Sequence, residues 1–163
     1  MLEAGEDPLY VARRIIRFAS EDVGMADPRA LQIAVSAYEA CHYIGMPECN
    51  DALAEAVIYM AVAPKSNAVD LAYGKAAQDA SSMLDEPVPL VIRNAPTKLM
   101  KDLDYGKGYQ YAHDSKDKLT NMQCLPDSLK DREYYVPVDQ GLEKQINERL
   151  KYIKEWKKKH RDL

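Results

Sequence analysis

Helix-starting and helix-ending residues divide the first half of the chain into segments of helix length. Asp7-Pro8 stands ahead of the first segment and Gly24 after it, and Asp27-Pro28 and Gly45 bound the second segment in the same way. An aspartate accepts hydrogen bonds from the free N–H groups of a helix start, proline suits the first turn, and glycine ends a helix in the left-handed conformation. The first two segments are therefore predicted to be helices.

Two more helices follow by the same reasoning. Pro47-Glu48 begins the third segment, Pro64 follows its end, and Ser66-Asn67 caps the fourth. The four predicted helices span residues 8–23, 28–44, 47–61 and 68–84. Because the links between them are short, consecutive helices are expected to lie antiparallel in one packed array.

Apolar residues recur along each predicted helix at spacings of three and four, which is typical of an amphipathic helix. The residues predicted to face the core are Leu9, Ala12, Ile15, Ile16, Ala19 and Val23 in the first helix, Leu31, Val35, Tyr38, Cys41 and Ile44 in the second, Leu53, Val57, Ile58 and Ala61 in the third, and Leu71, Ala72, Ala76, Ala80 and Met83 in the fourth. The residues chosen in the fourth helix are mostly small, which permits close helix approach.

From residue 85 onward the chain changes to short pieces and irregular segments, with one long helix at the end. The predicted pieces are an extended stretch at 87–92, a short helix at 96–103, an irregular tyrosine-rich segment or hairpin at 105–114, an extended stretch at 134–138 and a helix at about 140–159. The apolar side of the last helix consists of Leu142, Ile146, Leu150, Ile153 and Trp156. We therefore predict an all-α fold, with a multi-helix array in residues 1–84, and an irregular segment plus a C-terminal helix in residues 85–163 that pack on the same domain.

The charge of the chain is unevenly distributed. The formal net charge is −4, and residues 142–163 alone hold eight Lys or Arg and four acids. An acidic body with a basic C-terminal helix does not resemble a dedicated duplex-binding domain, which is basic along a face. No run of residues approaches the length of a membrane span, so no membrane partner is expected. The start of the chain has no targeting signal, and we expect it to lie within a longer protein.

The cysteines and histidines suggest no catalytic or metal centre. The chain has three cysteines, an odd number that favours reduced thiols in the cytosol. Cys41, His42 and Cys49, with Cys124 or His113 as a fourth ligand, match no zinc spacing, so buried cysteines that pack are expected instead. No nucleophile stands beside a general base, and no phosphate-binding loop is present. We therefore assign no catalytic, cofactor or metal residue within this chain.

Three basic features leave alternatives open. Gly106-Lys107-Gly108 favours a turn, although Lys107 could contact a phosphate backbone. The lysines at the end of the last helix are either the solvated side of an amphipathic helix or an attraction for nucleic acid. Arg13, Arg14 and Arg17 favour solvent-facing charges paired with acids such as Glu21, with contact to a partner as the second interpretation.

Several separate motifs, in the right order, give the chain a family resemblance. They lie at residues 5–14, 18–24, 44–49, 63–67, 93–98, 105–109 and 111–114. Together they resemble the C-terminal region of the RarA (MgsA) family of AAA+ ATPases, which includes the eukaryotic Werner-helicase-interacting protein. The resemblance covers essentially the whole chain.

The resemblance implies an all-helical domain, similar to the collar of clamp loaders, through which the family assembles into tetramers. It also implies that the ATPase domain, with its ATP and Mg²⁺, lies upstream and is absent here. Relatives of this kind are DNA-dependent ATPases that act at stalled replication forks and in recombination, near single-strand-binding protein, which implies a cytoplasmic, nucleoid-associated protein. The expected function is therefore oligomerisation; the alternative is a helical domain that binds single-stranded or forked DNA.

Residue type selects candidates for both functions. Interface cores favour Tyr and Trp, so the candidate subunit interface consists of Tyr105, Tyr109, Tyr111 and Trp156. The other interpretation of these residues is that they fix a long irregular segment onto its own helices. The candidate DNA contacts are Lys107, Lys157, Lys158 and Lys159.

Overall fold

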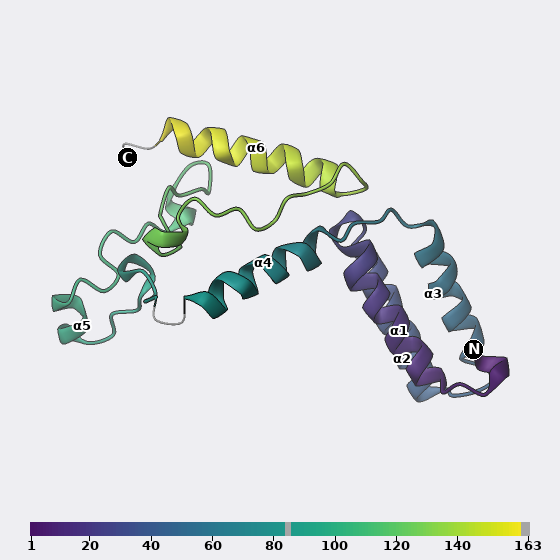
Figure 1. Ribbon diagram of the computed structural model, residues 1–163. Helices are drawn as coiled ribbons and strands as arrows, with labels where there is room; N and C mark the ends of the chain where they lie inside the picture. The colour runs from purple at the N-terminus through teal and green to yellow at the C-terminus, as the bar shows by residue number, and fades with distance from the viewer. Residues whose placement is uncertain (84–85, 161–163) are drawn as a thin grey trace. The chain divides into compact units, whose positions relative to one another are not determined.

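The structure, a computed structural model, describes residues 1–83 and 86–160 (Figure 1). Across these two ranges all regular structure is helical, which confirms the predicted all-α class. The α-helices are α1 (Pro8–Phe18), α2 (Arg29–Tyr43), α3 (Asn50–Val62), α4 (Ala68–Ser82), α5 (Lys98–Asp102) and α6 (Glu143–Lys159). Leu84, the last residue of the predicted fourth helix, lies outside the described residues.

The chain divides into two compact units. The first consists of Met1–Ala76 and Tyr134–Asn147, and the second of Ala77–Glu133 and Glu148–Leu163. The first unit holds α1, α2, α3 and the first part of α4 together with a piece from late in the chain. The predicted boundary between residues 84 and 85 falls outside the described residues, so that division of the chain stays a prediction.

Helices α1 and α3 both pack against α2 within the first unit. The residues buried between them include many small side chains: Ala12, Ala19, Ala30, Ala34, Ala37, Cys41, Cys49 and Ala56, with Ile15, Val23, Leu53 and Met60 as the larger members. Small residues at a contact allow two helix backbones to approach closely, because little side-chain volume separates them. The core of this unit is therefore narrow and rich in alanine.

The predicted signals at the ends of the first helix are confirmed. The carboxylate of Asp7 accepts hydrogen bonds from the backbone N–H groups of Leu9 and Tyr10, at 3.1 and 3.2 Å. The regular α-helix ends at Phe18 and continues as a π-helical turn, Ala19–Val23, before Gly24 at φ 52°. The helix predicted over residues 8–23 is thus present, with its last turn widened.

Asp27 does more than cap α2. Its carboxylate accepts from the backbone N–H of Arg29 at 3.2 Å and from the hydroxyl of Tyr59 at 2.5 Å. Hydrogen bonds from the Arg29 guanidinium, at 3.1 and 3.2 Å, lower the pKa of Asp27 from its usual value, with a further contribution from Tyr59. Since Tyr59 belongs to α3, the capping residue of α2 also ties α3 in place.

Two predicted helix starts were wrong by three residues. Helix α3 begins at Asn50 rather than Pro47, because the N–H of Cys49 donates to the carbonyl of Gly45 at 2.9 Å and closes a turn first. Helix α6 begins at Glu143 rather than near residue 140. Gly141 stands just ahead of it at φ 50°, a left-handed conformation that does not belong to a right-handed helix.

The predicted core faces of α2, α3 and α4 were partly wrong. Val57 and Ile58 are 51% and 66% exposed, whereas Ala56 and Met60 are buried. In α2 the stripe of Ala30, Ala34, Ala37 and Cys41 faces the core, while Leu31, Val35 and Ile44 are exposed. In α4 Leu71 is exposed, and Ala68 is the one buried residue among those described. Small side chains occupy the core positions because closely packed helices leave no room for large ones.

A buried carboxylate joins the segment 134–147 to the segment that follows α3. Glu143, at the start of α6, is 0% exposed. It accepts hydrogen bonds from the Ser66 hydroxyl at 2.9 Å, the Tyr135 hydroxyl at 2.8 Å and the backbone N–H of Val138 at 2.8 Å. Beside it, the N–H of Leu142 donates to the carbonyl of Ala26 at 2.8 Å. These bonds hold residues 134–147 against the segments that follow α1 and α3.

The Tyr135 hydroxyl gives this arrangement a pH dependence. Burial, and then the hydrogen bond to Glu143, raises the pKa of Tyr135 well above its usual value of 10.0. Below about pH 10 both folded and unfolded chains keep this proton, so the stabilisation is fully present. Above that pH the unfolded chain loses the proton first, and the free energy of unfolding falls as pH rises towards the folded-state pKa.

The Tyr135→Phe variant tests the contribution of the Tyr135 hydroxyl to stability and to its pH dependence. It should be about 1 kcal/mol less stable at neutral pH, because one hydrogen bond is lost, and its stability should fall less steeply between about pH 10 and 11. Urea unfolding followed by circular dichroism at several pH values measures both. If the free energy of unfolding falls as steeply with pH in the variant as in wild type, Tyr135 is not the source of the pH dependence. Some pH dependence should remain in the variant, because hydrogen bonding to Asp27 also raises the pKa of Tyr59.

Candidate interaction surfaces

Helix α3 carries apolar side chains that are exposed to solvent. Val57, Ile58 and Val62, three aliphatic side chains in two helical turns, are 51%, 66% and 79% exposed. The opposite side of the same helix packs into the core through Leu53, Ala56 and Met60. A helix that is apolar on both sides is normally covered on both sides. We name Val57, Ile58 and Val62 the α3 aliphatic face.

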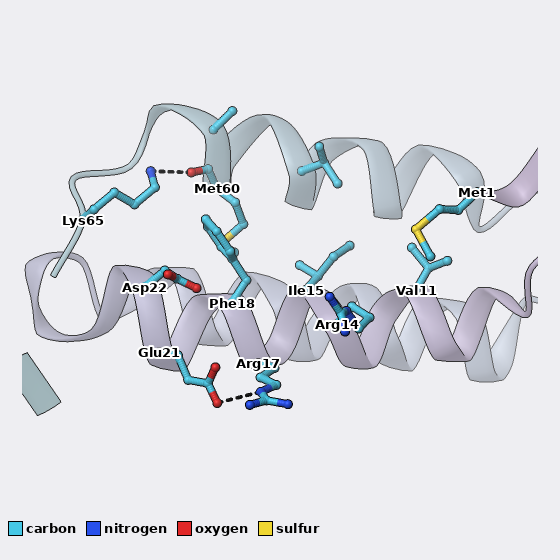
Figure 2. Close-up of a pocket in the computed structure, with 12 residues that line it drawn as sticks. Met1, Val11, Arg14, Ile15, Arg17, Phe18, Glu21, Asp22, Met60 and Lys65 are labelled. Carbon is cyan, nitrogen blue, oxygen red and sulfur yellow. Dashed lines mark hydrogen bonds and ion pairs between the residues drawn. The ribbon is translucent and has the colours of Figure 1, made fainter. Parts of the chain in front are cut away.

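A groove between α1 and α3 continues this surface. It has a volume of about 730 Å³, and its apolar lining includes Val11, Ile15 and Phe18 from α1 with Val57 and Met60 from α3. Figure 2 shows the side chains of Phe18 and Met60 approaching each other from the two helices. Val57 belongs both to this groove and to the α3 aliphatic face, so the two surfaces are continuous.

Charged side chains border the groove. Arg17 pairs with Glu21 at 2.7 Å on the same helix, as the sequence predicted for this arginine patch. Lys65 donates to the carbonyls of Met60, at 2.7 Å, and Ala63, so it caps the end of α3 (Figure 2). The same ammonium lies 5.9 Å from the centre of the Phe18 ring, a cation–π distance. The groove thus has an apolar floor and a charged border.

In the second unit, three of the four predicted interface aromatics line one cleft. We name it the aromatic cleft: Tyr109, Tyr111, Trp156 and His160 with Asp114 and Asp117, in a volume of about 480 Å³. The rings of Trp156 and His160 are stacked, with centres 4.2 Å apart and planes 17° apart. The indole N–H of Trp156 donates to Oδ2 of Asp117 at 2.8 Å. Tyr109 and Tyr111 are 57% and 55% exposed.

Tyr105 is engaged elsewhere in the same unit. Its hydroxyl accepts from Nη1 of Arg93 at 3.2 Å, and the Arg93 guanidinium lies 5.1 Å from the centre of its ring. The N–H of Gly106 donates to the carbonyl of Leu90 at 2.8 Å. Tyr105 therefore fixes the irregular segment onto its own unit, as the second interpretation of the tyrosines expected. An intersubunit role for any of the four aromatics stays a prediction.

The four candidate DNA-contacting lysines are exposed in two separate segments. Lys107 pairs with Asp104 at 3.0 Å, within a turn where Gly106 and Gly108 have φ values of 72° and 80°. Lys157–Lys159 form the last turn of α6, where cations complement the negative end of the helix dipole. A contact of these side chains with DNA stays a prediction.

Cys41 and Cys49 pack in the core of the first unit, 4% and 0% exposed. Burial, with the neighbouring Cys49, raises the pKa of the Cys41 thiol to about 11, which disfavours the thiolate that metals and electrophiles require. Cys124 is exposed. Among the described residues no three His, Cys, Asp or Glu side chains are grouped so that they could hold a metal ion. No helix in the same ranges is long and apolar enough to cross a membrane.

Comparison with known proteins identifies close relatives along the whole chain. Residues 1–154 match the family model described as MgsA AAA+ ATPase C terminal. The chain is 50% identical over 162 residues to replication-associated recombination protein A of Coxiella burnetii, covering 99% of this chain and 37% of that protein. It is 46% identical over 156 residues to the protein of the same name from Escherichia coli K12, covering 95% of this chain and 35% of that one.

A eukaryotic relative extends the comparison. The chain is 44% identical over 137 residues to ATPase WRNIP1 of Dictyostelium discoideum, covering 83% of this chain and 16% of that protein. The chain thus spans little more than a third of the length of the bacterial relatives it matches, and a smaller share of this one.

Proposed function

The chain belongs to the family of MgsA AAA+ ATPase C-terminal domains, and on this basis we propose that it is the oligomerisation domain of a RarA-type ATPase. In this proposal it holds copies of the protein together, as a tetramer, during replication-fork maintenance and recombination. ATP, Mg²⁺ and hydrolysis belong to the remaining length of the protein, and this domain contributes assembly rather than catalysis. DNA and single-strand-binding protein are partners of the full-length protein, which works in the cytoplasm close to the nucleoid.

The observation that supports assembly is the α3 aliphatic face. Fully burying an aliphatic side chain of this size contributes about 1.5–3 kcal/mol, so a monomer that leaves Ile58 and Val62 largely exposed forgoes a substantial stabilisation. A second copy that covers this face and the adjoining groove would recover it. The sequence had suggested the tyrosine-rich segment as the interface; α3 is the stronger candidate, because its exposed side chains are aliphatic and contiguous.

A charge placed in this face should dissociate the assembly. The Ile58→Glu/Val62→Glu variant should weaken association about 100-fold or more, because each carboxylate would be buried against apolar surface. Both positions are exposed in the single chain, so its helix content should not change. Light scattering coupled to size-exclusion chromatography measures the mass of wild type and variant.

The control is Gln78→Glu, which adds a single negative charge, against two in the double variant, at an exposed position of α4 and should leave the assembly intact. A wild-type chain that is monomeric at high concentration would overturn the proposal. So would a double variant with the same mass and the same dissociation on dilution as wild type. That second result would remove α3 from the interface.

DNA binding is the second candidate function, and the exposure of Lys107 and Lys157–Lys159 favours it. Neutralising phosphates releases counterions, so binding of this kind weakens steeply as salt rises. A salt titration with labelled single-stranded and forked DNA tests it. No binding at low salt would remove this candidate.

A further inference from the structure

The aromatic cleft combines two kinds of group that attract the same ligand. Three rings of tyrosine and tryptophan line it, and the faces of such rings attract cations, with tryptophan the most effective. Two carboxylates, Asp114 and Asp117, line it as well. A carboxylate pairs with a guanidinium through two parallel hydrogen bonds, and the planar guanidinium also stacks on aromatic faces.

The carboxylate of Asp117 is held in position. Oδ2 accepts the indole N–H of Trp156 at 2.8 Å. A carboxylate has about four acceptor positions on its two oxygens, so this bond leaves most of its capacity for a ligand. His160 stacks on one face of the indole at 4.2 Å, so the ring and the carboxylate form one ordered wall of the cleft.

The charge of the lining favours a cation over a phosphate. The lining contains two aspartates, Asp114 and Asp117, and one lysine, Lys116. Its formal charge is therefore −1 with His160 neutral. A phosphate in this space would meet two like charges. A volume of about 480 Å³ is in the range of ligand-binding clefts and is large enough for one long side chain with its flanking backbone.

From these observations we infer that the aromatic cleft binds the guanidinium group of an arginine side chain presented by a partner protein. The aromatic faces receive the plane of the guanidinium, and the carboxylates accept its N–H groups. This site lies entirely within the second unit, and the inference does not depend on the α3 aliphatic face or on self-association through it.

Trp156 provides a direct test, because it is the only tryptophan of the chain and its emission reports on the cleft. The probe is the blocked peptide Gly-Arg-Gly, titrated into the full chain at about 0.15 M salt. At that ionic strength charges more than about 8 Å apart are largely screened, which reduces the influence of Lys157–Lys159. We expect a saturable change in tryptophan emission. The citrulline peptide, neutral but of the same shape, should bind about tenfold more weakly or worse.

Asp117→Asn is the matched variant, since its amide oxygen can still accept the indole N–H. It should bind the arginine peptide about tenfold more weakly than wild type. Glu155→Gln removes one negative charge from an exposed position of the same helix as Trp156, outside the lining, and should bind as wild type does. Circular dichroism checks that both variants keep the helix content of the parent.

Three results would overturn the inference, and none requires a variant to fold. The first is the absence of a saturable change with the arginine peptide up to tens of millimolar. The second is equal binding of the citrulline peptide. The third is a stronger response to a single-stranded oligothymidine, which would assign the cleft to nucleobases instead.

A dilution series of the chain alone distinguishes the source of the arginine. If a second copy of the chain supplies the arginine, the tryptophan emission will depend on protein concentration. Constant emission on dilution, with a response to added peptide, assigns the arginine to a different protein.

Discussion

Replacing Glu143 by alanine is expected to lower the free energy of unfolding by about 3–5 kcal/mol, because three hydrogen-bond donors lose their acceptor at a cost of about 1–3 kcal/mol each. The Ser66 hydroxyl, the Tyr135 hydroxyl and the Val138 N–H would lose their common acceptor together. The Ser66 hydroxyl is buried and the other two donors are half-buried, so part of the loss is a desolvation penalty as well as a lost contact. The backbone hydrogen bond from the N–H of Leu142 to the carbonyl of Ala26 would remain.

Glu143→Gln separates the charge from the shape. The amide keeps one acceptor oxygen but turns its NH₂ group towards a donor, so we expect an intermediate loss of about 1–3 kcal/mol. Glu148→Ala, at an exposed position on the same helix, should change stability by less than about 0.5 kcal/mol. Urea unfolding followed by circular dichroism measures all three. A loss below about 1 kcal/mol for Glu143→Ala would show that the network does not hold the unit together.

Gly141→Ala should destabilise the chain by at least about 3 kcal/mol, for a different reason. Gly141 has φ +50°, and a Cβ there would overlap the carbonyl oxygen of Ala26 and lie 2.8 Å from Cγ of Pro64. The backbone cannot move away without breaking the hydrogen bond from Leu142 to the same carbonyl. Backbone strain of 1–3 kcal/mol for a non-glycine residue adds to this overlap.

Gly74→Ala is the matched control, and it should have the opposite sign. Gly74 lies within α4, and a Cβ there would meet nothing within 4 Å. Alanine in a helix interior is more stable than glycine by about 0.5–1 kcal/mol. Thermal and urea unfolding of the two variants measure the contrast. Equal and small effects for both would mean that the approach of residue 141 to Ala26 is not tight in solution.

The ends of the first helix could be predicted from sequence because capping is local. Asp7 lies within three residues of the N–H groups whose hydrogen bonds it accepts. Gly24 ends the helix through its own backbone conformation alone. The choice of core face could not be predicted in the same way. Helices α2 and α3 each have two apolar stripes, and which stripe turns inward depends on how closely the neighbouring helix approaches.

The buried carboxylate and the aromatic cleft depend on residues far apart in the chain. Glu143 resembles an ordinary acidic residue in the first turn of a helix, and its partner Ser66 lies 77 residues earlier. Trp156 and Asp117 are separated by 39 residues. Residue type alone selected Tyr109, Tyr111 and Trp156 as surface candidates, but the carboxylates beside them become visible only when the fold brings the two segments together.

The alanine-rich core of the first unit has a thermodynamic consequence. An alanine removes little hydrocarbon from water when it is buried, so three helices joined mainly through alanines gain modest stabilisation as a single copy. If neighbouring copies supply the missing burial, folding and association become linked equilibria, and the melting temperature rises with protein concentration. Dilution alone would then weaken the fold, which makes the abundance of the protein itself a determinant of how much of it is folded.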